Sequence, residues 1–277
     1  MAMNELQLFN AYMTGKGWKE ITKYTYRTIV KKFVELCPDY QGFDAEKAKN
    51  FIFKTRETKS RKTTKQMLIA LRAFYNCLGL NAAIWKYRIV PERKIPKHLT
   101  KEEVDRLLNK MDGKDIYSVR DKAMYELIYA GGLKTTEVIR LKMADVEIPK
   151  RRLWLGRKRA YFGKLAAAAL IEYIGRRSEF LPKVDNLFVN AQGIEISPQR
   201  VELRLKKYAV AAGVPENAVT PQALRNSLAV HLFDGGADAK TVQKIMRHRR
   251  ANHIGRYAET SEICRGEVEM LDYENMQ

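Results

Sequence analysis

The sequence predicts a mainly α-helical protein with a small antiparallel β-sheet, an α+β fold in two domains. Apolar residues recur at helical spacing throughout residues 4–80, which predicts a helical bundle there. Two short runs with strand character flank a glycine-containing turn at residues 156–159, which predicts a hairpin in the second half. Prolines among basic residues at 84–97 break the helical pattern. The predicted domains are therefore residues 1–83 and 98–277, joined by a linker at 84–97.

Turn residues divide the N-terminal domain into four expected helices. The first follows Asn4 and ends at Gly15, the second runs from about Glu20 to Cys37, the third opens at Asp44, and the fourth ends at Gly79. Most aromatic side chains of these helices are expected to form the core of the bundle.

A run of lysine, arginine and threonine at residues 54–65 is predicted to form a loop between the third and fourth helices. Cations and hydroxyl groups suit phosphate oxygens, although a solvated loop would have the same composition. The candidate DNA-binding residues of this run are Lys54, Arg56, Lys59, Arg61, Lys62 and Lys65.

The C-terminal domain opens with a clear helix start, because Thr100 and Glu103 can each accept a hydrogen bond from the other's backbone N–H. A second helix is expected to stop at Gly131 and Gly132. The elements predicted after it are hairpin strands at 153–155 and 160–162, a helix at 165–174, a short strand at 187–189, a helix opened by Ser197, a helix from Thr220 to Gly235, and a helix from Asp238 through His248.

The formal net charge of +19 favours a phosphate polymer as partner over a merely solvated surface. Residues 1–97 carry 20 basic and 8 acidic side chains, and residues 98–277 carry 31 and 24, so both halves are basic. No long apolar run and no signal-peptide pattern is present, which indicates a cytoplasmic protein without a membrane span. Cys37, Cys77 and Cys264 are widely spaced with no histidine at metal-ligand spacing, so no metal site or redox role is expected.

Residues 220–257 carry the groups needed to cut DNA through a covalent intermediate. That reaction needs a nucleophile, cations around the phosphate in its transition state, and a proton donor for the leaving 5′ oxygen. Arg225 is followed by His248 after 23 residues and by Tyr257 nine residues later. A second histidine in this stretch, His231, lies among apolar residues and is expected to be a hydrogen-bonded core residue.

This stretch resembles the second signature of the tyrosine recombinases, also called the phage integrase family, including the turn at 235–238 and Val242, Gln243 and Met246. Residues 129–141 resemble the first signature, and residues 95–100 and 186–190 resemble the family's domain start and mid-domain strand. The N-terminal bundle is similar to the core-binding domain. The resemblance implies a core-binding helical domain followed by a catalytic domain.

The resemblance also implies a role for each matched residue. Tyr257 would be the nucleophile that forms a 3′-phosphotyrosyl link, and Arg225 a bidentate clamp on the phosphate. His248 would donate a hydrogen bond to a non-bridging oxygen, and Glu137 would support the site from behind. Lys158 of the hairpin would protonate the leaving oxygen, although Arg157 can occupy that place because the hairpin is short.

Three positions depart from the family's pattern. Lys134 stands where the first arginine is expected, and an ammonium cannot give two parallel hydrogen bonds. Gln222 stands where histidine or lysine is usual, and an amide cannot act as an acid or base. Arg247 stands where glycine is common, and Arg249 and Arg250 follow His248; these arginines either add compensating charge or contact backbone phosphates.

The leading hypothesis is a site-specific recombinase or integrase that breaks and rejoins double-stranded DNA with neither metal nor nucleotide cofactor. Recombination by this route implies homodimers and homotetramers that form on DNA. Because of Lys134 and Gln222, the alternative is a catalytically impaired DNA-binding accessory or regulatory protein. A third reading is a relaxing enzyme of the type IB topoisomerase kind. The tail at 258–277 is expected to pack either on a neighbouring protomer or on its own domain.

Overall fold

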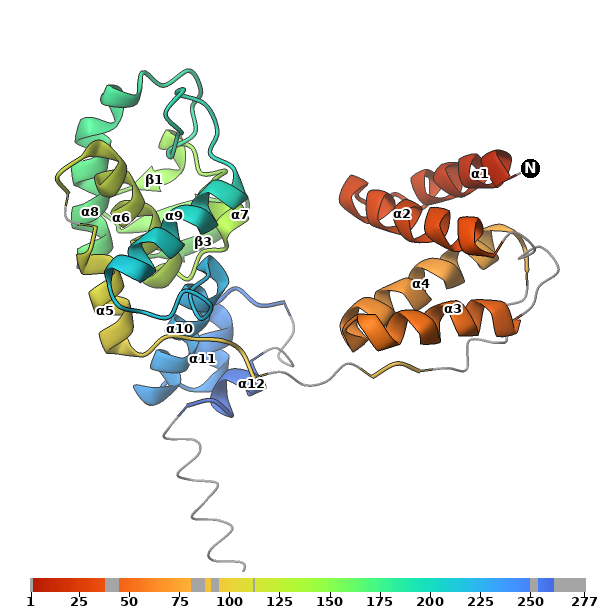
Figure 1. The fold of residues 1–277 in the computed structure, drawn as a ribbon. Helices are drawn as coiled ribbons and strands as arrows, with labels where there is room; N and C mark the ends of the chain where they lie inside the picture. Colours follow the sequence, from red (N-terminus) through yellow and green to blue (C-terminus); the bar gives the residue numbers. More distant parts are fainter. Residues whose placement is uncertain are drawn as a thin grey trace, which may run out of the picture. The chain divides into compact units, whose positions relative to one another are not determined.

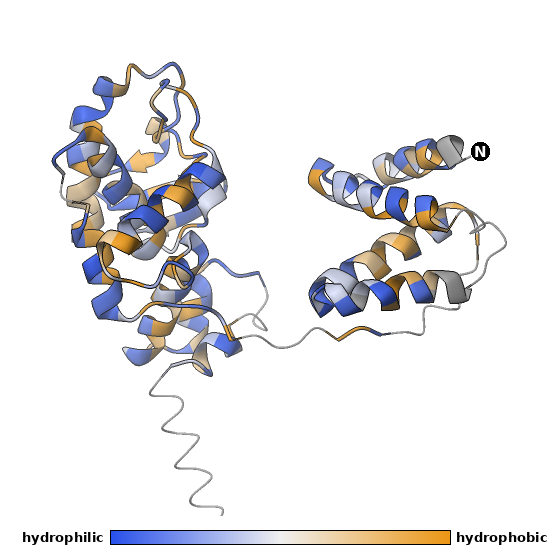
Figure 2. Cartoon of the chain, viewed as in Figure 1, coloured by the Kyte–Doolittle hydropathy of each residue, from blue (hydrophilic) through white to orange (hydrophobic). Residues whose placement is uncertain are grey.

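The structure, a computed structural model, describes residues 2–37, 45–80, 88–90, 95–111, 113–249 and 254–261. The chain divides into two compact units, Met1–Lys94 and Ile95–Gln277 (Figure 1). Residues 84–87 and 91–94 of the predicted linker, and 262–277 of the predicted tail, lie outside the described residues. Figure 2 shows hydrophilic and hydrophobic residues alternating along the helices of both units, the pattern of helices with one buried face.

The described part of the N-terminal unit is helical. Its helices are α1 (Ala2–Gly15), α2 (Glu20–Leu36), α3 (Ala45–Thr58) and α4 (Arg61–Cys77). Aromatic rings form much of the core, with Phe9 packed edge-on against Phe74 and Phe33 against both Phe51 and Tyr75. These rings come from all four helices, so one apolar core holds the bundle together.

The predicted loop at residues 54–65 is wrong, because only Lys59 and Ser60 lie outside helices. The hydroxyl of Ser60 accepts a hydrogen bond from the Thr63 backbone N–H at 3.2 Å, which caps α4. The basic run therefore occupies the end of α3 and the start of α4. Apart from Arg56, whose side chain is not described, its cations are exposed on these two helix ends and the tight turn between them.

The C-terminal unit is mainly helical. Its described helices are α5 (Lys101–Asn109), α6 (Ile116–Tyr129), α7 (Thr135–Val138), α8 (Lys164–Arg176), α9 (Pro198–Ala211), α10 (Pro221–Asp234), α11 (Ala239–Ile245), α12 (Gly255–Ala258) and two 3₁₀ helices, Met143–Asp145 and Arg177–Phe180. The predicted capping box between Thr100 and Glu103 is confirmed at the start of α5. Side chains of Ser197, Thr220 and Asp238 cap α9, α10 and α11.

A small antiparallel sheet lies beside these helices. Its strands are β1 (Val146–Glu147), β2 (Arg152–Leu155) and β3 (Lys158–Tyr161), in the order β1-β2-β3. Leu155 pairs with Lys158, so Gly156 and Arg157 alone form the turn. Gly156 has a φ of +64°, which glycine adopts without steric cost. This confirms the predicted hairpin and starts its second strand two residues earlier than expected.

Two predicted elements differ in the structure. Residues 187–189 form no strand, because this fully buried run makes only an isolated bridge from Val189 to Glu195. The helix predicted to run through His248 ends at Ile245, because Arg247 has a φ of +53° that a right-handed helix cannot contain. The early end of α11 shapes the candidate site.

Two packing arrangements position that site. Asp121 on α6 is fully buried and accepts hydrogen bonds from Arg120 and from Arg204 of α9, which ties α6 to α9. A separate apolar cluster that includes Val230, Met246 and Tyr257 packs α10, α11 and α12 together (Figure 1). Because α6 also packs against α10, the two arrangements belong to one unit.

Candidate active site

Arg225 lies inside α10 and is held by backbone carbonyls. The Thr220 side chain caps this helix, and Pro221 occupies its first turn, where the missing N–H does no harm. The Arg225 side chain is 1% exposed and donates to the carbonyls of Gly132 and Met246, each at 2.6 Å. A guanidinium has more N–H groups than these two carbonyls use, so donors remain for an anion.

Arg225 is charged despite its burial. Burial is the main cause that lowers the pKa of Arg225 to about 10, while the negative charge of Glu137 opposes this and the positive charge of Arg247 adds to it. The group stays protonated at neutral pH. A fully buried, protonated guanidinium is suited to an anion that enters the site.

Glu137 joins the α7 turn to the arginines. Its Oε2 atom accepts the backbone N–H of Lys134 at 2.8 Å, which closes the first turn of α7. The same oxygen lies 3.6 Å from Nη1 of Arg225 and 3.3 Å from Nη2 of Arg247. The Lys134 side chain is exposed, so its ammonium lies at the surface. The backbone of Lys134 holds the Glu137 carboxylate through its N–H.

Arg247 is a second arginine held at the same turn. Its Nη1 donates to the carbonyls of Gly131 at 3.1 Å and Ile245 at 3.0 Å, and its Nη2 donates to Gly132 at 2.5 Å. The side chain is 7% exposed. Arg225 and Arg247 therefore share the carbonyl of Gly132 and the carboxylate of Glu137.

Tyr257 on α12 lies against the start of α10. Its hydroxyl donates to Oδ1 of Asn226 at 3.1 Å, and the side chain is buried. Gln222 donates to the same Asn226 oxygen at 2.8 Å, and Asn226 donates to the carbonyl of Lys97 at 2.9 Å. Gln222 thus lies beside the tyrosine and shares its hydrogen-bond acceptor.

His248 follows the left-handed residue at the end of α11. Its ring lies edge-on to that of Tyr257, with centroids 6.1 Å apart and planes at 83°. The Gln243 side chain donates to the backbone carbonyl of His248 at 3.1 Å and fixes the segment. Arg225 binds the carbonyl of Met246, two residues before His248, and Tyr257 binds Asn226, the residue after Arg225, so the three spaced residues lie in one region.

The hairpin supplies cations to a cleft at this site. The cleft is lined by Lys158, Arg159, Lys240, Gln243, Lys244, Arg247, His248 and Arg249. Among these described lining residues there is no carboxylate. Lys158 is exposed and lines the same cleft as His248, whereas Arg157 lines a neighbouring pocket together with Arg159 and Arg247. The cleft is therefore a site for an anion.

The remaining predicted cations are distributed as follows. Arg249 is exposed at the cleft, and Arg250 lies outside the described residues. In the N-terminal unit, the side chain of Arg56 is also outside the described set. The exposed cations of that unit's basic run are Lys54, Lys59, Arg61, Lys62 and Lys65.

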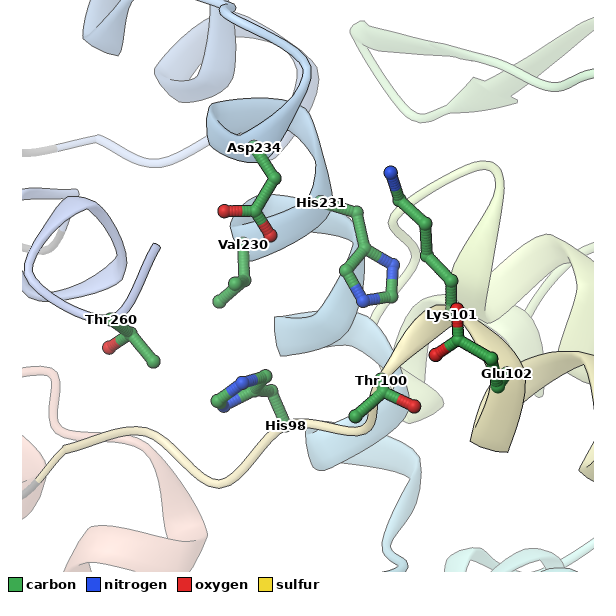
Figure 3. A pocket seen from close by; sticks show the side chains of 8 residues that line it. All are labelled: His98, Thr100, Lys101, Glu102, Val230, His231, Asp234 and Thr260. Carbon is green, nitrogen blue, oxygen red and sulfur yellow. The ribbon is translucent and has the colours of Figure 1, made fainter. Parts of the chain in front are cut away.

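A second pocket, lined by residues of α5 and α10, has a different chemistry. Figure 3 shows Val230, His231 and Asp234 projecting from α10 into it, with Glu102 on the opposite side. Its two carboxylates make it a poor phosphate site. His231 lies here with both ring nitrogens occupied: Nε2 donates to the carbonyl of Leu99, and Nδ1 accepts from Tyr129, each at 2.9 Å. Burial lowers the pKa of His231, so this histidine is a neutral structural residue.

Asn226 is the residue that sequence reasoning missed. It is 7% exposed and bridges the tyrosine hydroxyl, Gln222 and the chain entering the domain. An asparagine beside Arg225 carries no signal in the sequence, because its role depends on where α12 and the segment before α5 pass.

Neither a membrane helix nor a metal cluster is found in the part of the chain that the structure describes. No helix there is long and apolar enough to cross a bilayer. Over the same residues, no group of three or more histidine, cysteine or acidic side chains is placed to hold a metal ion.

Comparison with known sequences identifies relatives of this chain. The profile of the phage integrase family matches residues 97–262. Tyrosine recombinase XerC of Natranaerobius thermophilus is 32% identical over 273 residues, which cover 88% of this chain and 90% of the relative. Tyrosine recombinase XerD of Halalkalibacterium halodurans is 37% identical over 164 residues, which cover 56% of this chain and 54% of the relative.

Solved structures share the fold at low sequence identity. XerH site-specific recombinase bound to palindromic difH substrate superimposes with a TM-score of 0.78 at 19% identity, covering 96% of this chain and 84% of that one. The Tn1549 transposon integrase in complex with transposon right end DNA gives a TM-score of 0.77 at 19% identity, covering 97% and 98%. The predicted fold, mainly α with a small antiparallel sheet, is confirmed.

Proposed function

The chain belongs to the phage integrase family of tyrosine recombinases, and from this premise we propose that it breaks and rejoins double-stranded DNA at specific sites through Tyr257. The observation that carries the proposal is geometric: the rings of His248 and Tyr257 lie together, and Arg225 binds the carbonyl of Met246, two residues before His248. A cleft lined by cations opens at the same place. These groups supply a nucleophile and the charge that a pentacoordinate phosphate requires.

Cleavage is a transesterification, in which the phosphate passes from the 5′ oxygen of the DNA to the tyrosine oxygen. The Tyr257 oxygen attacks the scissile phosphorus, its proton passes to solvent, and the bond from phosphorus to the 5′ oxygen breaks. Lys158 donates a proton to the departing 5′ oxygen, and a 3′-phosphotyrosyl link remains. Attack by a 5′ hydroxyl of another strand reverses these steps. Because the phosphotyrosyl bond keeps the energy of the original ester, rejoining needs no nucleotide cofactor.

Arg225 and His248 stabilise the charge that develops on the phosphate. The carbonyls of Gly132 and Met246 fix the Arg225 guanidinium before DNA binds, so no reorientation is needed during reaction. His248, which lines the cleft, donates to a non-bridging oxygen. The Tyr257 hydroxyl donates a hydrogen bond to Asn226 in this structure. This bond must break before the tyrosine oxygen can attack the phosphorus.

Gln222 provides no base at the position where histidine or lysine is usual. It donates to Asn226, and an amide takes up no proton at neutral pH. Deprotonation of Tyr257 therefore relies on solvent and on the surrounding positive charge. We expect cleavage to be slow and to accelerate as the pH is raised.

Partners and location follow from the same activity. The exposed cations of the α3–α4 turn bind duplex DNA through its phosphates, together with Arg249 of the catalytic cleft. Strand exchange joins two sites, so the chain acts as a dimer on each site and as a tetramer on a pair. The protein works where the DNA is, in the cytoplasm.

Covalent capture tests the activity and selects the target sequence in the same experiment. A library of nicked duplexes with a randomised core is incubated with the chain, and strands that resist removal by detergent are amplified and selected again. We expect the parent chain to enrich a core sequence and to form an adduct with it. Tyr257→Phe should bind the selected duplex with unchanged affinity and form no adduct.

The alternatives give different outcomes. Selective, tight binding without adduct from the parent chain would indicate the accessory protein instead. Relaxation of a supercoiled plasmid lacking the selected core would indicate the relaxing enzyme. Recombination between two selected cores on one plasmid is the result that the proposed function requires.

A further inference from the structure

Arg247 sits in a backbone conformation that is unfavourable for its residue type. Its φ is +53°, in the left-handed region, and it directly follows Met246, the C-cap residue of α11. A residue with a side chain costs about 1–2 kcal/mol in this conformation, whereas glycine costs almost nothing. A glycine would therefore satisfy the backbone, and the arginine side chain must contribute something else.

That side chain reaches across to the turn between α6 and α7. Its two terminal nitrogens bind the carbonyls of Gly131 and Gly132 and the carboxylate of Glu137. It is more than nine-tenths buried, and its Nε has no hydrogen-bond partner among the described residues. The guanidinium is thus fixed in place and retains a donor that the protein does not use.

Two guanidiniums in this cluster face one carboxylate. Arg225 and Arg247 share the carbonyl of Gly132 and Oε2 of Glu137. Buried charges are normally balanced, and here one positive charge is left over. The cleft lined by Arg247, Lys158 and His248 adds further positive charge and no described carboxylate. An anion is the missing component of this cluster.

Lys134 does not provide a guanidinium at this turn. Its side chain is exposed, and its hydrogen bonds with Glu137 are made by its backbone N–H and carbonyl. An ammonium would in any case give a point charge without the two parallel donors of arginine. The α6–α7 turn nevertheless has a guanidinium bound to its carbonyls, supplied by the end of α11.

We propose that Arg247 supplies the second guanidinium for the scissile phosphate and takes the place that Lys134 leaves unfilled. This inference rests on the proposed function and names a further residue for it. The strained backbone at residue 247 positions the guanidinium. Arg225 and Arg247 then bind the phosphate as a pair, with Glu137 holding both.

A four-variant cycle tests the replacement: the parent, Arg247→Gly, Lys134→Arg, and the two changes together. The substrate is the nicked duplex selected by covalent capture, at saturating protein, and the readout is the single-turnover rate of adduct formation. We expect Arg247→Gly to slow the adduct by about 10²–10³-fold, the usual loss for one donor to a transition-state anion. In that background Lys134→Arg should recover about tenfold or more, whereas in the parent it should change the rate by less than about threefold.

Controls separate this role from a structural one. Arg151 also has a positive φ, of +46°, and is exposed, so Arg151→Gly removes the same charge and the same strain elsewhere and should leave the rate unchanged. Thermal melting is measured for every variant. If Arg247→Gly does not fold, Arg247→Lys replaces it, because it keeps the charge and loses the Nε donor of the guanidinium.

The outcomes are distinct. A parent-like rate for Arg247→Gly, or a loss that Lys134→Arg fails to restore, would overturn this inference while leaving the proposed function intact. Absence of adduct from the parent chain would overturn both. Recovery of the rate by Lys134→Arg without recovery of the melting temperature is the result that a purely structural role for Arg247 cannot give.

Discussion

The cations that we assign to DNA fall into two groups that are held in different ways. Arg225 and Arg247 are 1% and 7% exposed and are bound to backbone carbonyls of the α6–α7 turn and the end of α11. Lys158 of the hairpin and Lys62 of α4 are exposed at the surface. The first group is oriented by folding, and the second is free to be oriented by DNA.

The two groups are expected to contribute differently: the buried arginines by their fixed orientation, and the exposed lysines by electrostatic attraction to DNA. A buried guanidinium has already lost its water and its rotational freedom, so its interaction with a phosphate needs no reorganisation during reaction. An exposed lysine contributes mainly through long-range attraction that salt screens, unless it acts on a specific atom. The buried pair should therefore control the rate of cleavage, and most exposed cations should control affinity.

Arg225→Lys should give the largest loss of cleavage rate. The substitution keeps the charge but removes the parallel donors and leaves the carbonyls of Gly132 and Met246 short of partners. Adduct formation on the selected duplex should slow by about 10³-fold, with a much smaller change in affinity. Single-turnover rates and binding titrations measure the two effects. A loss that falls mainly on affinity would contradict the assignment of Arg225 to the transition state.

Lys158→Ala sharpens the comparison, because Lys158 is exposed and yet is proposed to act on one atom, the leaving 5′ oxygen. Loss of a general acid should slow cleavage by about 10²-fold. A duplex with sulfur in place of the leaving 5′ oxygen needs no proton at that atom and should restore the rate of Lys158→Ala. Arg157→Ala is the matched control from the same hairpin. If sulfur rescues Arg157→Ala and not Lys158→Ala, Arg157 is the proton donor.

Lys62→Ala should have the smallest effect. An exposed lysine on α4 that neutralises one phosphate should lower the slope of log affinity against log salt by about 0.9 and leave the cleavage rate at saturation unchanged. Binding titrations at several salt concentrations measure the slope. A changed rate at saturating protein would show that the exposed group also sets geometry.

The sequence predicted the local parts of this molecule well. Helix starts with capping side chains, such as Thr100 and Thr220, depend on neighbouring residues and were found correctly. The predicted loop at residues 54–65 is wrong because Ser60 caps a helix that begins at Arg61. The apolar run at 187–189 looked like a strand because burial on all sides and strand formation give the same composition.

The candidate site was predictable only where spacing along the chain carries the information. Arg225, His248 and Tyr257 follow a recognisable spacing, and the structure brings their segments together. The contacts of Asn226 and Arg247 join segments about thirty to more than a hundred residues apart, so no local pattern contains them. The roles of all these residues in cleavage remain predictions.

The central claim is that Tyr257 becomes covalently joined to DNA. Digestion of the captured adduct with trypsin and nuclease, followed by mass spectrometry, identifies the residue that carries the phosphate. The account predicts a nucleotide joined through its 3′ phosphate to Tyr257, in the tryptic peptide that spans residues 257–265. A nucleotide linked to any other residue would contradict it.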